Sequence, residues 1–371
     1  MEDYRTIKIR IYPNKLQEEI IEETFCCCQK LWNIILGELI EYHKVNKSVK
    51  KVNIKEYLRE FPTFQKVDIL ALYSVQFELE RAFRQSVSTG NYPHFKSRNG
   101  RLKSFATTNK FGGLEISENY IVIKKIGKVR AKISQKVEDV SKVTNVEIRK
   151  QGDGKYYVCL TTTKEIKNMS IKPIRILGLD YKSDGLYMDS DGNIGTNHRY
   201  FRQSEKKIAK IQRNLEKKRG GIQGKENSNN YNKQLIKLDK AYTKIKNQRK
   251  DNLHKLSTHL AEKYDAIAVE DMSMKEIVQE RKLHLGKSTY DNGYYDFLRM
   301  LEYKLKERGK MLIKINRYYP STKKCSSCGK IKNMNLDERI YECPSCGLKI
   351  DRDLNAAINI KKEGERILKN M

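Results

Sequence analysis

Basic and apolar side chains alternate at the start of the chain, from Tyr4 to Tyr12. A period of two predicts a β-strand that rests one face on a core and turns Lys8 and Arg10 outward. Pro13 ends this pattern. The chain is therefore expected to begin with a half-buried strand whose exposed face is positively charged.

A helical pattern follows directly. Asn14, with Gln17 three residues later, matches the capping box that begins many helices. Apolar residues then recur every three or four positions as far as Leu39, and Cys28 lies on this apolar stripe. A thiol on such a stripe is more often a small buried apolar residue than a reactive group. We expect a long helix with Cys28 in the core, and helical patterning continues through Phe77–Phe83.

Aromatic and basic residues are interleaved after this helical block, between positions 92 and 105. The pattern suits nucleic acid, because basic side chains pair with phosphates and aromatic rings stack on bases. It is equally typical of a solvated loop that aromatic residues anchor to the protein. Together with the charged face of the first strand, the candidate nucleic-acid-binding residues are Arg5, Lys8, Arg10, Tyr92, Phe95, Lys96, Arg98, Arg101 and Lys103.

The period changes to two between Gly113 and Lys164. Alternation on both sides of Glu118-Asn119, and again on both sides of Gly152-Asp153-Gly154, predicts β-hairpins. The first strand of the chain would complete this small antiparallel sheet or barrel. A helical block would thus be inserted into a β domain.

A second architecture begins after Pro173. Ile174–Asp180 is an apolar strand that ends in a carboxylate, and Ala266–Glu270 is another. A hairpin with its turn at Asp191-Gly192 follows the first of them. The remaining expected elements are two long basic helices, the first ending at Gly220-Gly221, a helix around Tyr295–Arg308, a strand over Met311–Ile315 and a final helix from Asp353.

The excess of Lys and Arg gives the 371-residue chain a formal charge of +29 and a pI near 9.6. Such a charge is too extreme for an ordinary metabolic enzyme and indicates a polyanionic partner. A membrane surface is the competing partner, but no apolar run approaches the roughly 18 residues that span a bilayer, and no signal-peptide pattern opens the chain. We expect a prokaryotic cytosolic protein, associated with the nucleoid. Its basic helices would contact nucleic acid, although charge runs on helices are often only solvated faces.

Four of the eight cysteines form two C-x-x-C-G pairs, namely Cys325 with Cys328 and Cys343 with Cys346. The glycine after each pair permits the tight turn that brings two thiolates to one tetrahedral ion. None of the six histidines lies nearby, so all four ligands should be cysteines. A closed set of four ligands leaves no position for water or substrate, so the predicted zinc is structural and catalysis must lie elsewhere. The remaining thiols fit a reducing cytosol.

Asp180, Glu270 and an aspartate of the segment Asp351-Arg-Asp353 are the candidate catalytic residues. A carboxylate at the end of a buried strand is unfavourable unless a cation compensates its charge. Three such groups can converge on a pair of Mg²⁺ ions, which activate water against a phosphodiester. Each acid also has a simpler interpretation: a turn cap for Asp180, an ion pair for Glu270, and a helix cap for Asp351 or Asp353. Their joint occurrence favours the metal site.

Several motifs together resemble the TnpB family of insertion-sequence proteins, which is related to the type V CRISPR effectors. The similarity runs along nearly the whole chain. The motifs are I-R-I-Y-P-N, Y-P-H-F-K-S, I-L-G-L-D, I-A-V-E-D-M, Y-P-S-T-K-K-C-S-S-C-G and C-P-S-C-G-L-K-I-D-R-D-L-N-A-A-I-N-I. Related effectors keep a D-x-N-x-A core, so the resemblance assigns the third acidic position to Asp353 and not to Asp351. After Asp180, where many relatives continue with Leu-Gly or a similar small pair, this chain has Tyr181-Lys182-Ser183.

The resemblance implies an α/β multidomain fold. A wedge-like β-barrel domain would span residues 1–13 and 111–170, with a helical recognition lobe inserted over 14–110. An RNase H-like (RuvC) nuclease domain would span 171–320 and 350–371, with the four-cysteine zinc ribbon inserted at 321–349. By the same resemblance, Asp180, Glu270 and Asp353 would bind catalytic Mg²⁺, and the N-terminal domains would hold an RNA scaffold and read a short motif beside the DNA target.

The function that the resemblance implies is that of an RNA-guided DNA endonuclease of a transposable element, acting as a monomer in its ribonucleoprotein. It would pair double-stranded DNA with a guide RNA made from the end of its element and cut both strands with one site by two-metal-ion hydrolysis. Two other functions stay open. An RNA-guided binding protein would repress a promoter without cutting, and a zinc-ribbon accessory of transposition would bind DNA without RNA and largely irrespective of sequence.

Overall fold

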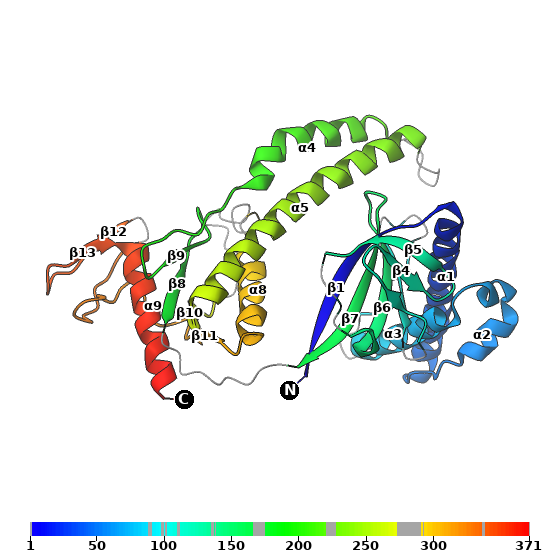
Figure 1. Cartoon of the computed structure of the whole chain (residues 1–371), viewed down its shortest axis with the longest axis horizontal. Helices are drawn as coiled ribbons and strands as arrows, with labels where there is room; N and C mark the ends of the chain where they lie inside the picture. Colours follow the sequence, from blue (N-terminus) through cyan, green and yellow to red (C-terminus); the bar gives the residue numbers. More distant parts are fainter. Residues whose placement is uncertain are drawn as a thin grey trace. The chain divides into compact units, whose positions relative to one another are not determined.

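The computed structural model describes residues 2–87, 91–97, 100, 102–109, 112–134, 137, 139–165, 175–219, 228–272, 291, 293–335 and 338–370. The chain forms two compact units, Glu2–Glu165 and Ile166–Met371, which we call the N-terminal and C-terminal units (Figure 1). Each unit has a hydrophobic core of its own. In the described ranges no helix has both the length and the apolar character that crossing a membrane requires.

A seven-stranded antiparallel sheet forms the centre of the N-terminal unit, in the order β2-β6-β7-β1-β5-β4-β3. β1 pairs with β7 along most of its length and with β5 at its C-terminal end, so the first strand does complete the sheet, as predicted. Its inward residues Ile7, Ile9 and Ile11 are buried, whereas Lys8 is exposed. The strands are β1 Glu2–Tyr12, β2 Lys103–Thr108, β3 Glu115–Ile116, β4 Tyr120–Ile123, β5 Gly127–Lys132, β6 Val143–Lys150 and β7 Tyr156–Glu165.

Helices cover one face of this sheet. They are α1 Lys15–Asn46, α2 Ile54–Glu60 and α3 Ile69–Val87, with a 3-10 turn at Pro62–Lys66. The predicted capping box is present: Gln17 N donates to Asn14 Oδ1 at 2.9 Å, and Asn14 N donates to Gln17 Oε1 at 3.1 Å. Gln17 Nε2 also donates to the carbonyl of Lys128 on β5 at 2.8 Å. Cys28 is buried, as predicted, and its burial raises the pKa of its thiol.

The sheet of the N-terminal unit stays open, which corrects the expectation of a β-barrel. The edge strands β2 and β3 do not pair with each other in the described part of the chain. The helices supply the apolar cover that closure would otherwise provide. Phe25 on α1 packs edge-to-face on Phe105 of β2, with ring centroids 5.4 Å apart. Glu22 on α1 pairs with Lys103 on β2 at 2.9 Å and with Lys150 on β6 at 2.6 Å.

A four-stranded sheet in the order β11-β10-β8-β9 forms the centre of the C-terminal unit. β10 is parallel to both β8 and β11, and β9 runs antiparallel to β8. Parallel strands need cover on both faces. Ile267 and Val269 of β10 pack with residues of α5 and α8, whereas Ala266 and Ala268 pack with Ile360 of α9. The strands are β8 Ile176–Tyr181, β9 Tyr187–Asp189, β10 Ala266–Glu270 and β11 Met311–Ile315, and the helices are α5 Asn229–Lys263, α8 Tyr294–Lys306 and α9 Arg352–Lys369.

The sequence also predicted a hairpin and two long basic helices in this unit. The hairpin after β8 is confirmed, because Gly192 has a positive φ of 89° and Met188 forms a bridge with Ile194. The two basic helices are α4 Tyr200–Glu216 and α5, which share a small core of Ile208, Leu215, Leu238 and Ile245. The predicted helix stop at Gly220-Gly221 lies outside the described residues.

Two glycines bring α9 into direct backbone contact with the sheet. A Cβ atom added at Gly178 on β8 would lie 2.1 Å from the carbonyl oxygen of Ala357 and 2.6 Å from the nitrogen of Lys361, both on α9. A Cβ added at Gly364 on α9 would lie 2.5 Å from the Cβ of Ala268 on β10. Because Gly178 lies two residues before Asp180 on the same strand, this approach sets how close the start of α9 comes to that carboxylate.

Replacing Gly178 by alanine should lower the free energy of unfolding of the C-terminal unit by about 3 kcal/mol, since the two atoms nearest to the new methyl group are backbone atoms of α9, which cannot move without shifting the helix. The thermal transition of the purified protein, followed by calorimetry, measures this change. Gly37→Ala is the matched control: nothing lies within 4 Å of its added Cβ, and it should raise helix stability by roughly 0.5–1 kcal/mol. Equal behaviour of the two variants would contradict the close approach of α9.

Candidate metal centres and nucleic-acid surface

Two carboxylates end neighbouring parallel strands. Asp180 is the fifth of the six residues of β8, and Glu270 is the last residue of β10. The register pairs Leu179 with Val269, so Asp180 and Glu270, the next residues of the two strands, lie side by side. Since Leu179 and Val269 pack toward α5 and α8, the alternation of a strand directs Asp180 and Glu270 to the face that α9 covers. The sheet thus brings two of the three predicted acids to one edge.

The start of α9 supplies the third acid and separates the roles of Asp351 and Asp353. Asp351 is the N-cap: its Oδ1 accepts from the backbone nitrogens of Asp353 at 2.9 Å and Leu354 at 3.0 Å. Asp353 lies in the first helical turn and is 7% exposed. The cap therefore occupies the carboxylate of Asp351, and this geometry favours Asp353 as the partner of Asp180 and Glu270.

The charges of Asp353 and Glu270 act on Asp180. Burial raises the pKa of Asp180 well above its usual value, and the nearby charges of Asp353 and Glu270 raise it further. Burial also raises the pKa of Glu270 to about 7. Asp180 is thus close enough to both other carboxylates to be repelled by them, and a compensating cation would lower the free energy of the ionised site.

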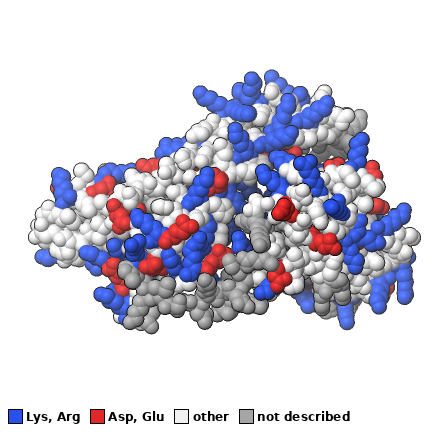
Figure 2. Space-filling view, in the orientation of Figure 1, with Lys and Arg blue, Asp and Glu red and all other residues white. Residues whose placement is uncertain are grey.

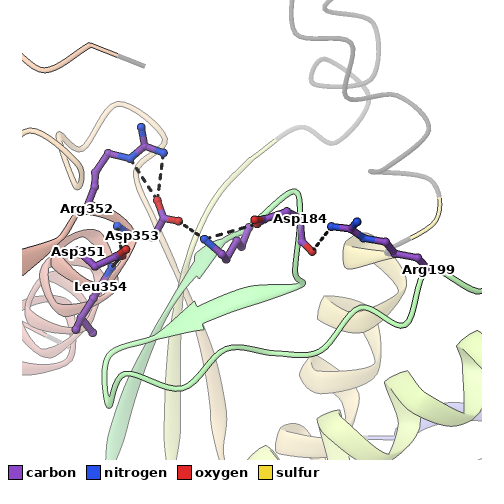
Figure 3. Close-up of polar contacts among 7 residues, drawn as sticks. Asp184, Arg199, Asp351, Arg352, Asp353 and Leu354 are labelled. Carbon is purple, nitrogen blue, oxygen red and sulfur yellow. Dashed lines mark hydrogen bonds and ion pairs between the residues drawn. The ribbon is translucent and has the colours of Figure 1, made fainter. Parts of the chain in front are cut away.

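Two basic side chains hold Asp353 (Figure 3). Lys182 Nζ donates to Asp353 Oδ2 at 2.6 Å, and Arg352 donates to Oδ1 from Nε at 3.3 Å and from Nη2 at 3.2 Å. Burial raises the pKa of Asp353, but these contacts outweigh burial, and the net shift is downward. Lys182 Nζ also lies 3.6 Å from Asp184 Oδ1, and Arg199 Nη2 donates to the carbonyl of Asp184 at 3.1 Å.

The four predicted cysteine ligands meet in space. Cys325 Sγ lies 3.6 Å from Cys346 Sγ, and Cys328 Sγ lies 3.6 Å from Cys343 Sγ. Zinc–sulfur bonds of about 2.3 Å in a tetrahedron place the sulfurs roughly 3.8 Å apart, so the cluster is compatible with structural zinc. Among the residues that the structure describes, this is the only group of three or more His, Cys, Asp or Glu side chains whose ligand atoms all lie within 4.8 Å of one another. The oxygens of the three acids are spaced more widely.

The two C-x-x-C-G turns have the same backbone geometry. Gly329 N donates to the carbonyl of Cys325, and Gly347 N donates to the carbonyl of Cys343, both at 3.0 Å. The two glycines have positive φ angles of 78° and 72°, which explains why glycine follows each pair. Backbone N–H groups of Cys346 and Ser345 lower the pKa of the Cys343 thiol to about 6. The second turn lies between β12 Ile340–Glu342 and β13 Lys349–Asp351.

Two buried asparagines join this cysteine module, residues 321–349, to α9. Asn355 Oδ1 accepts from the backbone nitrogen of Ser326 at 2.9 Å, and Asn355 Nδ2 donates to the carbonyl of Lys324 at 2.8 Å. Asn359 Nδ2 donates to the carbonyls of Ser321 at 2.8 Å and Lys324 at 2.6 Å. Both asparagines are at most 1% exposed. The sequence pattern alone did not assign them a role, although both follow Asp353 within two turns of one helix.

The predicted nucleic-acid-binding residues of the N-terminal unit differ in their accessibility. Tyr92 hydrogen-bonds His43 at 2.9 Å and stacks on Phe83, and Lys96 Nζ lies 3.8 Å from the ring centre of Trp32. These two residues therefore act as anchors of the loop on α1, the alternative that the sequence left open, whereas Phe95 is exposed. Of the other predicted residues, Lys103 forms an ion pair with Glu22. Lys8 lies over the ring of Tyr157, Arg10 lies over the ring of Tyr12, and Arg5 is half-buried. Arg98 and Arg101 lie outside the described residues.

Lys and Arg side chains gather over α4 and the N-terminal part of α5 (Figure 2). The exposed basic residues of this surface include Lys210, Arg213, Lys244 and Lys246. A groove formed by the first turns of α5 and by Lys218, just after the end of α4, carries four more lysines, which could contact a phosphate backbone. The residues that line it are Lys218, Asn230, Lys233, Gln234, Ile236, Lys237 and Lys240.

Three family models match separate parts of the chain. Residues 172–281 match a family described as "Probable transposase", residues 294–360 match "Cas12f1-like, TNB domain", and residues 1–48 match "Helix-turn-helix domain". The second of these segments contains the four cysteines and Asp353. In this structure the third segment holds β1 and the single long helix α1.

Two relatives match almost the whole chain, and both are named "Putative RNA-guided DNA endonuclease". The protein from Streptomyces pristinaespiralis is 26% identical and is matched over 97% of this chain and 89% of its own length. InsQ from Escherichia coli K12 is 26% identical over 99% of this chain and 94% of its own. "TnpB-like protein L79" of Acanthamoeba polyphaga mimivirus is 34% identical over 38% of this chain and 28% of its own.

The fold is similar to that of a protein chain in a solved complex. A chain of the "Cryo-EM structure of the Cas12f1-sgRNA-target DNA complex" superposes with a TM-score of 0.62 and 14% sequence identity, covering 97% of this chain and 99% of its own. At this identity the likeness concerns the fold. The match spans both units.

Proposed function

Because the chain belongs to the TnpB family, we propose that it is an RNA-guided endonuclease that cleaves double-stranded DNA beside a short adjacent motif. The names of its relatives and the fold support this proposal. The observation that carries it furthest is local: Asp180 is buried on one sheet edge beside Glu270 and Asp353, and the charges of both raise its pKa.

The C-terminal unit is, in this proposal, the RuvC-like nuclease. Asp180, Glu270 and Asp353 fit a magnesium centre, because oxygen ligands of hard carboxylates suit Mg²⁺ and because the repulsion of Asp180 by the other two calls for a cation. Bound there, the metal would supply an activated water and stabilise the leaving oxygen of a phosphodiester. Asp180 is buried, whereas Glu270 is only half-buried and therefore within reach of water. Arg352 and Lys182 both contact the carboxylate of Asp353 at the start of α9.

The basic surfaces would hold nucleic acid. Lysines of α4 and α5 contact the phosphate backbone, which gives binding that weakens steeply with salt. The N-terminal unit, with its β1 face and Phe95, would hold the RNA scaffold and read the adjacent motif. The proposal includes the domain boundaries that the resemblance implies, namely 1–13 with 111–170, 14–110, 171–320 with 350–371, and 321–349. It also includes the structural role of zinc and a monomeric protein within the ribonucleoprotein.

The direct test is cleavage by the ribonucleoprotein. The protein is purified from cells that express the end of its element, the RNA that co-purifies is sequenced, and the complex is mixed with a duplex that matches the guide. We expect a defined RNA and a double-strand break that requires Mg²⁺ and that EDTA prevents. Target retention without cleavage in any divalent metal would indicate the RNA-guided repressor instead. Absence of a defined RNA, with DNA binding similar across sequences, would indicate the transposition accessory.

A further inference from the structure

The third carboxylate already has cationic partners on both of its oxygens. Lys182 Nζ donates to Asp353 Oδ2 at 2.6 Å, and Arg352 shares Oδ1 through two longer contacts of 3.2 and 3.3 Å. The side chains of Lys182 and Asp353 are only 14% and 9% exposed. A short charge-assisted hydrogen bond that is screened so little by water is a strong one. A divalent cation that uses Asp353 therefore competes with these partners for the carboxylate oxygens.

A second carboxylate lies within reach of Lys182. Asp184 Oδ1 is 3.6 Å from Lys182 Nζ, and its side chain is 59% exposed. The backbone around it is fixed in part by Arg199, which donates to the carbonyl of Asp184 (Figure 3). The ammonium group can therefore leave Asp353 and still keep an acidic partner. The exposed position of Asp184 makes that second pairing the weaker of the two.

We propose that Lys182 is a built-in competitor for the catalytic cation, bound to Asp353 in the metal-free protein and moved to Asp184 when the metal site fills. The proposal rests on the proposed function, since it takes Asp353 as a metal ligand. Lys182 is then a residue that sets the metal concentration at which the nuclease becomes competent. It acts through Asp353 and needs no contact with the substrate.

The competition predicts opposite effects for two substitutions. Lys182→Met removes the charge but keeps the aliphatic stem, so it should tighten divalent-metal binding by about tenfold, the size expected for the loss of one charge-assisted contact. Asp184→Asn removes the alternative partner of Lys182 and should weaken metal binding about two- to threefold. Lys314→Met, which removes a positive charge from an exposed pair with Glu302 on the same unit, should change nothing.

Manganese is the probe, since electron paramagnetic resonance measures free Mn²⁺ directly. The ribonucleoprotein of each variant is titrated with Mn²⁺ in the absence of DNA, and the dissociation constant is compared with that of the wild type. The Mn²⁺ concentration for half-maximal cleavage should shift in the same direction, while the rate at saturating Mn²⁺ stays within about twofold. This split between affinity and maximal rate is what a merely structural role of Lys182 would not produce.

Two outcomes distinguish a failure of the proposed role of Lys182 from a failure of the proposed nuclease function. Unchanged or weaker Mn²⁺ binding by Lys182→Met would overturn the competition. Mn²⁺ binding by the wild type that Asp180→Ala fails to reduce would instead place the metal elsewhere, and the proposed nuclease site would be wrong. If Lys182→Met melts well below the wild type in EDTA, Lys182→Gln replaces it: the amide keeps a donor without the charge, and an intermediate gain in affinity is then expected.

Discussion

Replacing Asp180 by alanine should reduce cleavage of a guide-matched duplex by at least about a thousandfold, because the substitution removes a buried carboxylate of the proposed metal site. Binding of the target should persist, since base pairing and basic surfaces remote from this strand end provide it. Single-turnover cleavage in Mg²⁺ and a parallel binding assay with the same complex measure the two effects. Cleavage within tenfold of the wild type would rule Asp180 out as a metal ligand.

The same substitution site offers a second readout that does not depend on activity. In the absence of metal, burial raises the pKa of Asp180, and the charges of Asp353 and Glu270 raise it further. Asp180→Asn removes the repulsion by these charges, so the metal-free protein should melt at a higher temperature even though it no longer cuts. A structural aspartate that stabilises the fold would give the opposite result.

Asp351 and Asp353 provide the matched pair for this prediction. Asp353→Asn should abolish cleavage as Asp180→Ala does. Asp351→Asn should leave cleavage and stability nearly unchanged, because asparagine is about as good a helix N-cap as aspartate. Loss of cleavage in both variants, or only in Asp351→Asn, would contradict the assignment of roles at the start of α9.

Replacing Cys343 by serine should remove the metal of the cysteine module and with it the local fold. A site that needs four thiolates loses most of its affinity when one is absent, and the binding energy of structural zinc, roughly 10–16 kcal/mol, is folding energy for such a small module. We expect one zinc per chain in the wild type and none in the variant, measured by mass spectrometry of the metal. Amide hydrogen exchange of residues 321–335 should become fast.

Loss of the folded cysteine module should also disturb the site of Asp180, Glu270 and Asp353. Asn355 and Asn359 would keep their buried amides without the backbone partners at Ser326, Lys324 and Ser321, which is unfavourable. The start of α9 would shift, and cleavage should fall by at least about a hundredfold. Cys26→Ser, an exposed thiol on α1, is the control and should retain zinc and activity. A variant of Cys343 that holds zinc and cuts normally would contradict both the ligand set and the coupling.

Local patterns in the sequence predicted the elements that depend on local chemistry. The capping box at Asn14, the buried position of Cys28 and the strand that carries Asp180 near its end follow from neighbouring residues. The structure contains all three, although the strand continues to Tyr181. The meeting of the four cysteines also followed, because the spacing and glycines of each C-x-x-C-G turn determine the local geometry. The sequence did not predict features that depend on contacts between segments far apart in the chain.

The sheet of the N-terminal unit shows why. Alternation reveals which face of a strand is buried but not what covers it, so a barrel and an open sheet under helices have the same signature. Phe25 and Glu22 on α1 decide between them, through partners on β2 and β6. The contact of Lys182 with Asp353 joins residues 171 positions apart. Only the packing of α9 on the sheet of the C-terminal unit reveals this contact. The anchoring of Tyr92 and Lys96 likewise depends on residues of α1 and α3 that lie far away in the sequence.

No linker residue separates the cysteine module from α9. Asp351 is at once the last residue of β13, paired with Ile340, and the cap of the helix that carries Asp353. A helix turns by about 100° per residue, so one residue inserted here would swing Asp353 to a different side of α9 while the sheet stays in place. Chains built on this plan can vary their loops freely, but this joint tolerates substitution only, and its length should be invariant wherever the carboxylate is used.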